Sequence, residues 1–220
     1  MHHHSPSTIY HLLFTIYLFC FSIWTAPAIT NASGNLSSRP PVQCRLGKTS
    51  TEAVSWRWRP DAVVTIYYMK NHFTPGETAA FSQAISKWNS ALREINSQIV
   101  FIVGGESDSE VAQDTSITVV RGLPHGNERV GESRLYSMSN GVRSVRVTIS
   151  PLVTDLNALV SLMTHELGHS LGLADCYKCK RGTTTMAAFR DDNKDNEVYE
   201  PSDCDKYVLA SSYAASLAMR

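Results

Sequence analysis

The sequence lacks an excess of charge of either sign. Its 220 residues contain 20 Lys and Arg against 20 Asp and Glu, so the formal net charge at pH 7 is zero. Nucleic acids and anionic membranes are bound through basic patches, and this balance supports neither kind of partner. No internal repeat is visible. A hydrophobic fraction of 43% and a charged fraction of 18% are typical of a globular chain, which is long enough for one domain with a core.

Long apolar runs are missing as well. The N-terminal run from Ile9 to Trp24 is short for a membrane span, which needs about 20 residues. Ala26-Pro27-Ala28 follows it and forms a small-x-small cleavage pattern. We interpret residues 1–28 as a secretory signal peptide, although lysine and arginine are absent from its beginning. An uncleaved signal anchor is the alternative.

Cysteine is scarce, with five residues in the chain. Cys20 leaves with the predicted signal peptide, and an even number remains for an oxidising compartment. The remaining residues are Cys44, Cys176, Cys179 and Cys204. We expect them to form two disulfides, and all three connectivities stay open.

Residues 29–50 are rich in Ser, Asn, Pro and Gly and show no periodicity. We interpret them as a flexible leader or a short pro-segment before a domain of residues 51–220. Asn31 and Asn35 each begin an N-x-S sequon and are candidate glycosylation sites. The alternative is that both sequons are unused.

The order of extended and helical patterns predicts an α/β arrangement on a mixed sheet. Runs rich in β-branched and aromatic residues predict strands. These runs cover residues 63–68, 99–103, 117–120, 135–138 and 142–149. Gly104-Gly105 is expected to stop the second strand, and Asn140-Gly141 predicts a hairpin between the last two.

Three helices are expected. Thr74 and Glu77 form a capping box at the start of the first helix. The second helix should begin near Thr154 and carry the motif described next. Pro201-Ser202-Asp203 is typical of a helix start and predicts the last helix.

The most informative stretch reads HELGHSLGLAD. His165 and His169 are four residues apart and therefore lie on one helix face, where both imidazoles can bind a single zinc ion. Glu166 is then placed as general base for a zinc-bound water. Gly172 can end the helix and reverse the chain. Asp175 follows as the candidate third ligand.

Zinc held by three protein ligands leaves a fourth position for water and lowers the pKa of that water to about 7. A carboxylate in place of a third imidazole should weaken the ion as a Lewis acid. Asp175 therefore predicts a pH optimum different from that of a zinc site with three imidazoles. His125 is the fallback ligand if Asp175 does not bind. The alternative to this interpretation is a helix whose histidines are only solvated or hydrogen-bonded in the core.

The motif resembles the metzincin signature, HExxHxxGxx followed by a third ligand. The matching residues are His165, Glu166, His169, Gly172 and Asp175. Most metzincins have histidine last, and the aspartate version is similar to snapalysin-type bacterial peptidases. The resemblance also implies a methionine turn beneath the zinc. The segment of residues 184–188 looks like that turn, with Met186 as its methionine, and a core-filling methionine is the alternative.

The order of elements also resembles a matrixin-type catalytic domain. This implies a zincin-like α+β fold whose mixed, twisted sheet has an antiparallel edge strand, together with an active-site helix and a C-terminal helix. In that family the edge strand, here residues 133–138, pairs with extended substrate.

Matrixin-type structural metal sites are not apparent, so one catalytic Zn²⁺ is expected. Cys44 could act as a cysteine switch, but a disulfide is the favoured interpretation.

These patterns predict a secreted, monomeric zinc endopeptidase that acts on peptide or protein substrates. No nucleic-acid partner is expected, and no membrane contact after signal cleavage. A catalytically inactive zincin-fold protein used for binding is the alternative from another class, and the intact Glu166 argues against it. A third possibility is an HExxH protein outside the metzincins with a more distant ligand.

Overall fold

The computed structural model describes Cys44 and residues 51–110, 113–126, 129–138, 141–180, 182–188 and 198–218. The predicted signal peptide and the candidate glycosylation sites Asn31 and Asn35 lie outside these residues. Most of the predicted leader and Asn140 of the predicted hairpin also lie outside them. Within the described part of the chain, no helix is long and apolar enough to cross a membrane.

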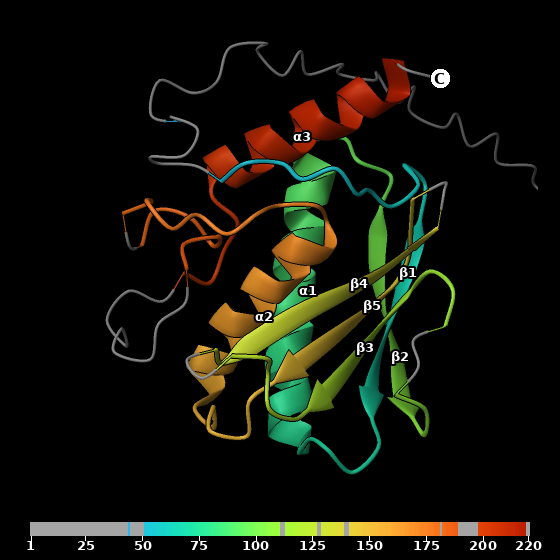
Figure 1. Ribbon diagram of the computed structural model, residues 1–220, viewed down its shortest axis with the longest axis vertical. Helices are drawn as coiled ribbons and strands as arrows, with labels where there is room; N and C mark the ends of the chain where they lie inside the picture. The colour runs from blue at the N-terminus through green and yellow to red at the C-terminus, as the bar shows by residue number, and fades with distance from the viewer. Residues whose placement is uncertain are drawn as a thin grey trace, which may run out of the picture. The chain divides into compact units, whose positions relative to one another are not determined.

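Five strands form one mixed sheet in the order β2-β1-β3-β5-β4 (Figure 1). Neighbouring strands run parallel except β4, which is antiparallel to β5 and forms one edge. The strands are β1 (Val63–Met69), β2 (Val100–Ser107), β3 (Ser116–Arg121), β4 (Gly131–Met138) and β5 (Gly141–Ile149). The predicted mixed sheet with an antiparallel edge strand is confirmed.

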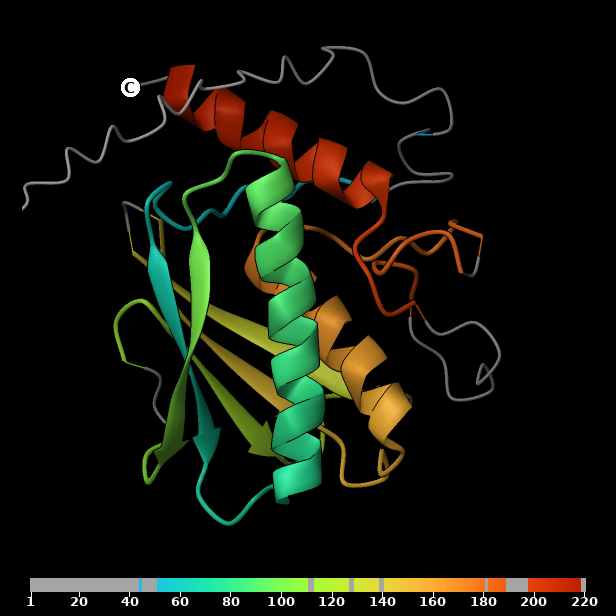
Figure 2. The same cartoon turned by 180° about the vertical axis from the view of Figure 1, so that it is seen from behind.

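Two helices, α1 (Pro75–Glu94) and α2 (Leu156–Ser170), lie side by side across one face of the sheet (Figure 2). The capping box predicted for α1 is confirmed. The amide of Thr74 donates to the Glu77 carboxylate over 2.7 Å, and the amide of Glu77 donates to the Thr74 hydroxyl over 3.3 Å. Both amides lack a partner within the helix, so these bonds satisfy donors that would otherwise need water.

The core lies between the helices and the sheet. The fully buried indole of Trp88 on α1 donates to the carbonyl of Thr164 on α2 over 2.7 Å and joins the two helices. The last helix, α3 (Asp203–Ala218), begins where predicted. The amide of Asp205 donates to the Ser202 hydroxyl over 3.1 Å, and the amide of Ser202 donates to the Asp205 carboxylate over 2.9 Å.

The prediction that Gly104-Gly105 ends the second strand is wrong. β2 continues through both glycines to Ser107. Its pairing with β1 passes from Val103 directly to Gly105, which leaves Gly104 unpaired as a bulge. A Cβ on Gly104 would lie 2.5 Å from the Tyr67 ring, and Gly105 has a φ of +87°. The two glycines therefore permit a bulge within the strand and do not stop it.

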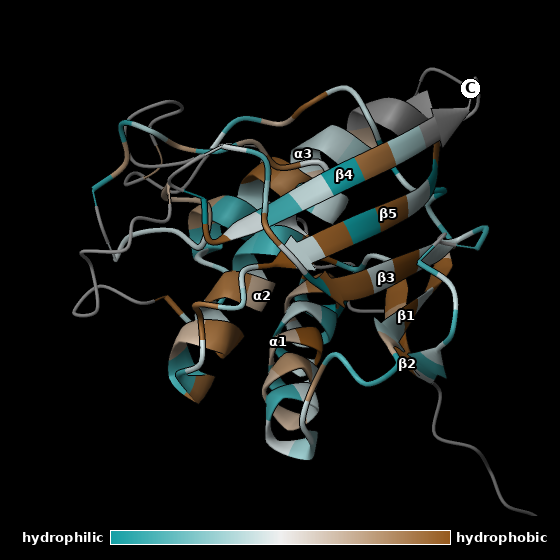
Figure 3. Ribbon diagram, turned by 60° about the horizontal axis from the view of Figure 1, so that its bottom comes forward, coloured by the Kyte–Doolittle hydropathy of each residue, from teal (hydrophilic) through white to brown (hydrophobic). Residues whose placement is uncertain are grey.

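The sheet is most hydrophobic near its centre. Figure 3 shows β3 brown along much of its length, whereas β4 and β5 alternate between hydrophobic and hydrophilic residues. The first five residues of β3 are buried without alternation, as expected for a strand covered on both faces. The alternating edge strand β4 borders the site described next.

Candidate metal site and cleft

Helix α2 carries both histidines of the HELGHSLGLAD motif. The carboxylate of Asp155 caps its N-terminus and accepts a hydrogen bond from the amide of Ala158 over 2.8 Å. This start agrees with the helix predicted to begin near Thr154. His165 and His169 lie one turn apart near the C-terminal end, with ring centroids 4.6 Å apart. The first ring is buried and the second is half-buried.

The end of α2 reverses the chain. The amide of Gly172 donates to the carbonyl of His169 over 2.9 Å, and the amide of Leu173 donates to the carbonyl of Gly168 over 3.0 Å. These are the two bonds of a Schellman motif, and Gly172 has the positive φ that the motif requires, +95°. The prediction that Gly172 ends the helix is confirmed. The reversal brings Asp175 back over α2.

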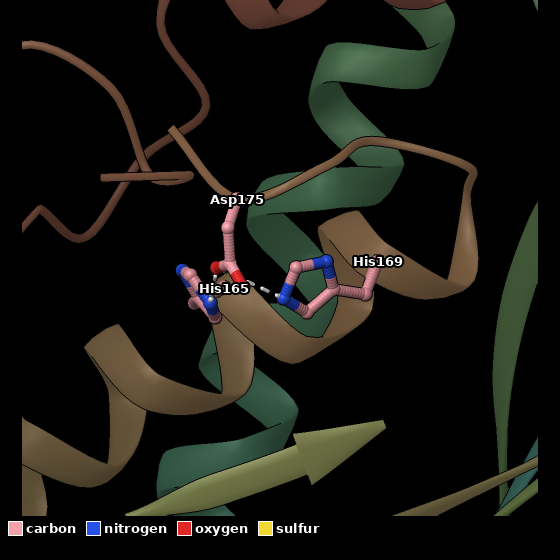
Figure 4. Close-up of side chains that lie close together, drawn as sticks. All are labelled: His165, His169 and Asp175. Atoms are coloured by element: carbon pink, nitrogen blue, oxygen red, sulfur yellow. Dashed lines mark ion pairs between the residues drawn. The ribbon is translucent and has the colours of Figure 1, made fainter. Parts of the chain in front are cut away.

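Each imidazole turns its Nδ1 atom toward a main-chain carbonyl. The Nδ1 of His165 lies 2.7 Å from the carbonyl oxygen of Thr185, and that of His169 lies 2.9 Å from the carbonyl oxygen of Leu173. Because a carbonyl oxygen only accepts, Nδ1 is the donor in both rings. Each Nε2 is left to face the carboxylate of Asp175, which reaches toward both rings (Figure 4).

The spacing of the three donor atoms fits a tetrahedral metal ion. The Oδ1 atom of Asp175 lies 3.2 Å from Nε2 of His165 and 3.4 Å from Nε2 of His169. Ligands bound tetrahedrally to zinc at 2.0–2.1 Å lie about 3.3 Å from one another. All three donor atoms lie within 4.8 Å of each other. Among the residues that the structure describes, no other group of three His, Cys, Asp or Glu side chains converges in this way.

The carboxylate of Asp175 and the imidazole of His169 also stabilise each other's charged forms. Burial opposes the charged form of His169, but the hydrogen bond to Asp175 and the negative charge of Glu166 raise its pKa to about 9. Burial likewise opposes the charged form of Asp175, but hydrogen bonds from His165 and His169 hold its pKa far below its usual range. The site is therefore a place where positive charge is favoured.

The fallback ligand His125 does not join this group. Its Nδ1 lies 2.9 Å from Oε2 of Glu132, and the guanidinium of Arg134 lies 3.0 Å from the same ring nitrogen. The imidazole is exposed and belongs to a charged cluster next to β4. The structure thus brings Asp175, and not His125, to the two imidazoles of α2.

Glu166 lies in the wall of a cavity of about 430 Å³ that also contains the three donor residues. Its side chain is 2% exposed, and its carboxylate accepts a hydrogen bond from the Ser133 hydroxyl over 2.6 Å. Gly131 lines the same cavity. No sequence signal identifies Ser133 or Gly131, because Ser133 is 33 residues from Glu166 and only the folding of β4 brings it there.

Met186 is fully buried beneath α2. A Cβ on Gly168 would lie 2.3 Å from the Met186 sulfur, so the sulfur packs directly against the helix backbone. The amide of Met186 donates to the Thr184 hydroxyl over 3.0 Å, and the amide of Cys176 donates to the Met186 carbonyl over 2.7 Å. The segment therefore turns beneath the helix and is tied to the residue that follows Asp175.

A buried carboxylate on α3, Asp205, holds this turn in place. It accepts a hydrogen bond from the amide of Thr185 over 3.1 Å and another from the Thr184 hydroxyl. The Ser202 hydroxyl donates to it over 2.8 Å. Several donors compensate the cost of burying the charge. The Ser202-x-x-Asp205 pattern reveals the helix cap in the sequence, but the contact with residues 184–185 depends on tertiary structure.

Tyr177 is a further cavity residue that no sequence pattern singled out. Its hydroxyl donates to Oδ2 of Asp175 over 3.1 Å. The negative charge of that carboxylate raises the pKa of the Tyr177 hydroxyl. Because Oδ2 is held by the phenol, Oδ1 is the oxygen that faces the two imidazoles. Tyr177 thus helps to orient the third donor.

The four cysteines among the described residues pair as Cys44 with Cys204 and Cys176 with Cys179. The first disulfide connects the predicted leader to α3 over a sequence separation of 160 residues. The second closes a short loop directly after Asp175. With its sulfur bonded to Cys204, Cys44 has no thiolate to offer to the metal site, which leaves the cysteine-switch alternative without support in this structure.

No protein-family model and no curated protein match the chain. A solved structure of myroilysin is similar, with a TM-score of 0.34 and 17% identity, over 54% of this chain and 44% of that chain. A second myroilysin structure gives a TM-score of 0.33 and 16% identity, over 55% and 47%.

High choriolytic enzyme 1, a hatching-enzyme zinc protease from the medaka fish Oryzias latipes, is also similar. Its TM-score is 0.34 and its identity 20%, over 56% of this chain and 50% of that chain. The matches thus cover half or less of these solved chains. Similarity at this level shows no family membership.

Proposed function

We propose that this chain is a secreted zinc endopeptidase of the metzincin type, with Glu166 as its general base. The observation that carries the proposal is a convergence of side chains. His165, His169 and Asp175 meet in a cavity that also contains Glu166 and one edge of the sheet.

The donor set suits zinc. Two imidazole nitrogens and one carboxylate oxygen are common zinc ligands, and three protein ligands leave a position open, as in catalytic sites. His165, His169 and Asp175 would hold the ion, and the carbonyls that accept from Nδ1 would fix the orientation of both rings. The bound ion would polarise a peptide carbonyl as a Lewis acid and lower the pKa of water.

Glu166 would carry the protons. Its carboxylate takes a proton from water as the water oxygen bonds to the peptide carbonyl carbon. It then delivers a proton to the amine as the carbon–nitrogen bond breaks, so that the carboxylate is regenerated. The almost complete burial of this side chain keeps the proton transfer away from bulk water.

The edge strand β4 would recognise the substrate backbone. Among the described strands, β4 pairs only with β5, so its other side offers main-chain N–H and C=O groups. Gly131, Ser133 and Leu135 of β4 line the cavity that contains Glu166. An extended peptide that adds to this edge would be read largely through its backbone, which supports cleavage within a chain of varied sequence.

Secretion is part of the proposal. Two disulfides are typical of a protein that matures outside the reducing cytosol. The signal peptide of residues 1–28, the glycosylation sites Asn31 and Asn35, and the monomeric state remain predictions from sequence.

The proposal is tested with the purified, zinc-supplemented protein, casein as substrate and metal analysis by mass spectrometry. Glu166→Ala should retain zinc and lose activity by roughly 10²–10⁴-fold, the usual contribution of a general base. Asp175→Ala should lose zinc at concentrations where the wild type is saturated. His125→Ala is the matched control, a histidine outside the cluster, and should retain both zinc and activity.

Two results would contradict the proposal. If the wild type and Glu166→Ala are equally inert while both bind zinc, the chain is a binding protein with a zincin-like site. If His125→Ala loses zinc and Asp175→Ala keeps it, His125 and not Asp175 is the third ligand.

A further inference from the structure

Two residues of β4 lie against the carboxylate of Glu166. The Ser133 hydroxyl donates to Oε2 over 2.6 Å and also lies 3.2 Å from the main-chain carbonyl of Glu166. On the other side, a Cβ added to Gly131 would lie 2.4 Å from Oε1. Both carboxylate oxygens therefore face the edge strand.

The buried carboxylate depends on this strand for its hydrogen bond. An ionised carboxylate that is 2% exposed needs a donor to offset its desolvation. Among the residues that the structure describes, Ser133 is the side chain that donates to it. Gly131 has no side chain, and the space where its Cβ would lie is occupied by Oε1.

We propose that Ser133 and Gly131 are positioning residues for Glu166: the strand that would bind the substrate backbone also sets the direction of the general base. Ser133 holds one carboxylate oxygen by a hydrogen bond, and Gly131 leaves room for the other. The role rests on the proposed peptidase function. It matters because proton transfer needs the base within hydrogen-bond distance of the water, and small displacements are costly.

Removal of the hydroxyl should lower turnover and leave substrate binding unchanged. Ser133→Ala takes away the donor to Oε2 without altering the main-chain groups of β4. We expect kcat to fall by about tenfold to a hundredfold, the effect of one hydrogen bond to a charged group, with KM within about twofold. Ser133→Thr keeps a hydroxyl on a β-branched residue that strands accommodate well, and should restore most of the kcat.

A side chain at Gly131 should displace the base more strongly. The added methyl of Gly131→Ala meets the tip of Glu166 and, at 2.8 Å, a methyl of Leu162. Both are ends of flexible side chains, so the variant should fold while its carboxylate moves. We expect kcat to fall by about a hundredfold or more, because misplacement of about 1 Å can cost that much.

The experiment compares kcat, KM and zinc content of the full secreted protein and these variants on one peptide substrate. Ser144→Ala is the matched control, because Ser144 is a buried serine on the neighbouring strand β5. It should keep the wild-type kcat. An unchanged kcat in zinc-loaded Ser133→Ala overturns the proposal, and so does an equal loss in Ser133→Thr.

A second measurement does not depend on activity. Urea unfolding of the metal-free wild type, Ser133→Ala, Glu166→Ala and the double variant should show non-additive stabilities, because alanine at either position removes the hydrogen bond between the two side chains. Additive stabilities overturn the proposed contact. If the wild type cleaves no peptide but the stabilities are non-additive, the peptidase function fails while the contact between β4 and Glu166 stands.

Discussion

Helices α1 and α2 are neighbours on the same face of the sheet, yet they bury different kinds of side chain. The buried residues of α1 are all apolar: Ala80, Phe81, Ala84, Ile85, Trp88, Ala91 and Leu92. In α2 every residue from 159 to 168 is buried, including four with polar side chains. These are Ser161, Thr164, His165 and Glu166.

The buried polar groups of α2 are tolerated because each has a partner. The Thr164 hydroxyl donates to a carbonyl within the helix over 2.7 Å, and the Ser161 hydroxyl donates to the carbonyl of Val198 over 3.1 Å. His165 and Glu166 are held by Thr185 and by β4. An unpaired polar group in such a place would cost about 1–3 kcal/mol. The comparison therefore separates a helix that supplies stability from one that carries the candidate chemistry.

The largest expected effect on stability comes from Trp88, the α1 side chain that supports α2. Trp88→Ala removes a fully buried indole and its hydrogen bond to Thr164, and should lower the free energy of unfolding by about 3–5 kcal/mol in urea titrations. Zinc affinity of the folded variant should stay close to that of the wild type. A clear fall in the zinc affinity of the folded variant would show that α1 contributes to the metal site as well as to stability.

A pair of glycines offers a matched test of the two helices. Gly168→Ala on α2 places a methyl 2.3 Å from the Met186 sulfur and should cost about 1–3 kcal/mol by overpacking. In Gly76→Ala on α1 the nearest atom to the new methyl is 3.8 Å away, and the free energy of unfolding should rise by up to about 1 kcal/mol through helix propensity. Thermal unfolding of both variants measures the difference. Equal effects would mean that Met186 does not pack tightly against α2.

The smallest expected effect concerns pH and the start of α1. Burial disfavours the charged form of Glu77, but the hydrogen bonds from Thr74 and the charge of Arg121 lower its pKa below the ordinary value. The folded protein thus binds this proton less readily than the unfolded chain. The stabilisation is present above the unfolded pKa, near 4.3, and is lost as the pH falls through the lower folded pKa.

Glu77→Gln keeps a hydrogen-bonding side chain but removes the charge beside Arg121. The substitution should lower the free energy of unfolding by about 1 kcal/mol at pH 7, the upper range for an ion pair such as that between Glu77 and Arg121. It should also make the free energy of unfolding fall less steeply as the pH decreases. Urea titrations between pH 2 and 7 follow both changes. If the free energy of unfolding of this variant falls with decreasing pH as steeply as that of the wild type, another carboxylate causes the loss of stability in acid.

Much of α2 could be predicted because its signals are local. His165, Glu166 and His169 share a helix face through spacing alone, and Gly172 ends the helix through bonds that reach back only a few residues. The wrong prediction at Gly104-Gly105 has the opposite cause. Whether a glycine pair stops a strand or forms a bulge depends on the partner strand, which the local pattern does not contain.

The sequence by itself determined the pair of imidazoles, the adjacent carboxylate, the capped start of α1 and the likeness of the motif to a zinc site, because these depend on residues within a turn or two. Only the tertiary structure decided which carboxylate faces the imidazoles and which side chains hold Glu166. Those contacts join α2 to β4, to the turn at Met186 and to α3. They form only when segments distant in sequence are packed around the same helix.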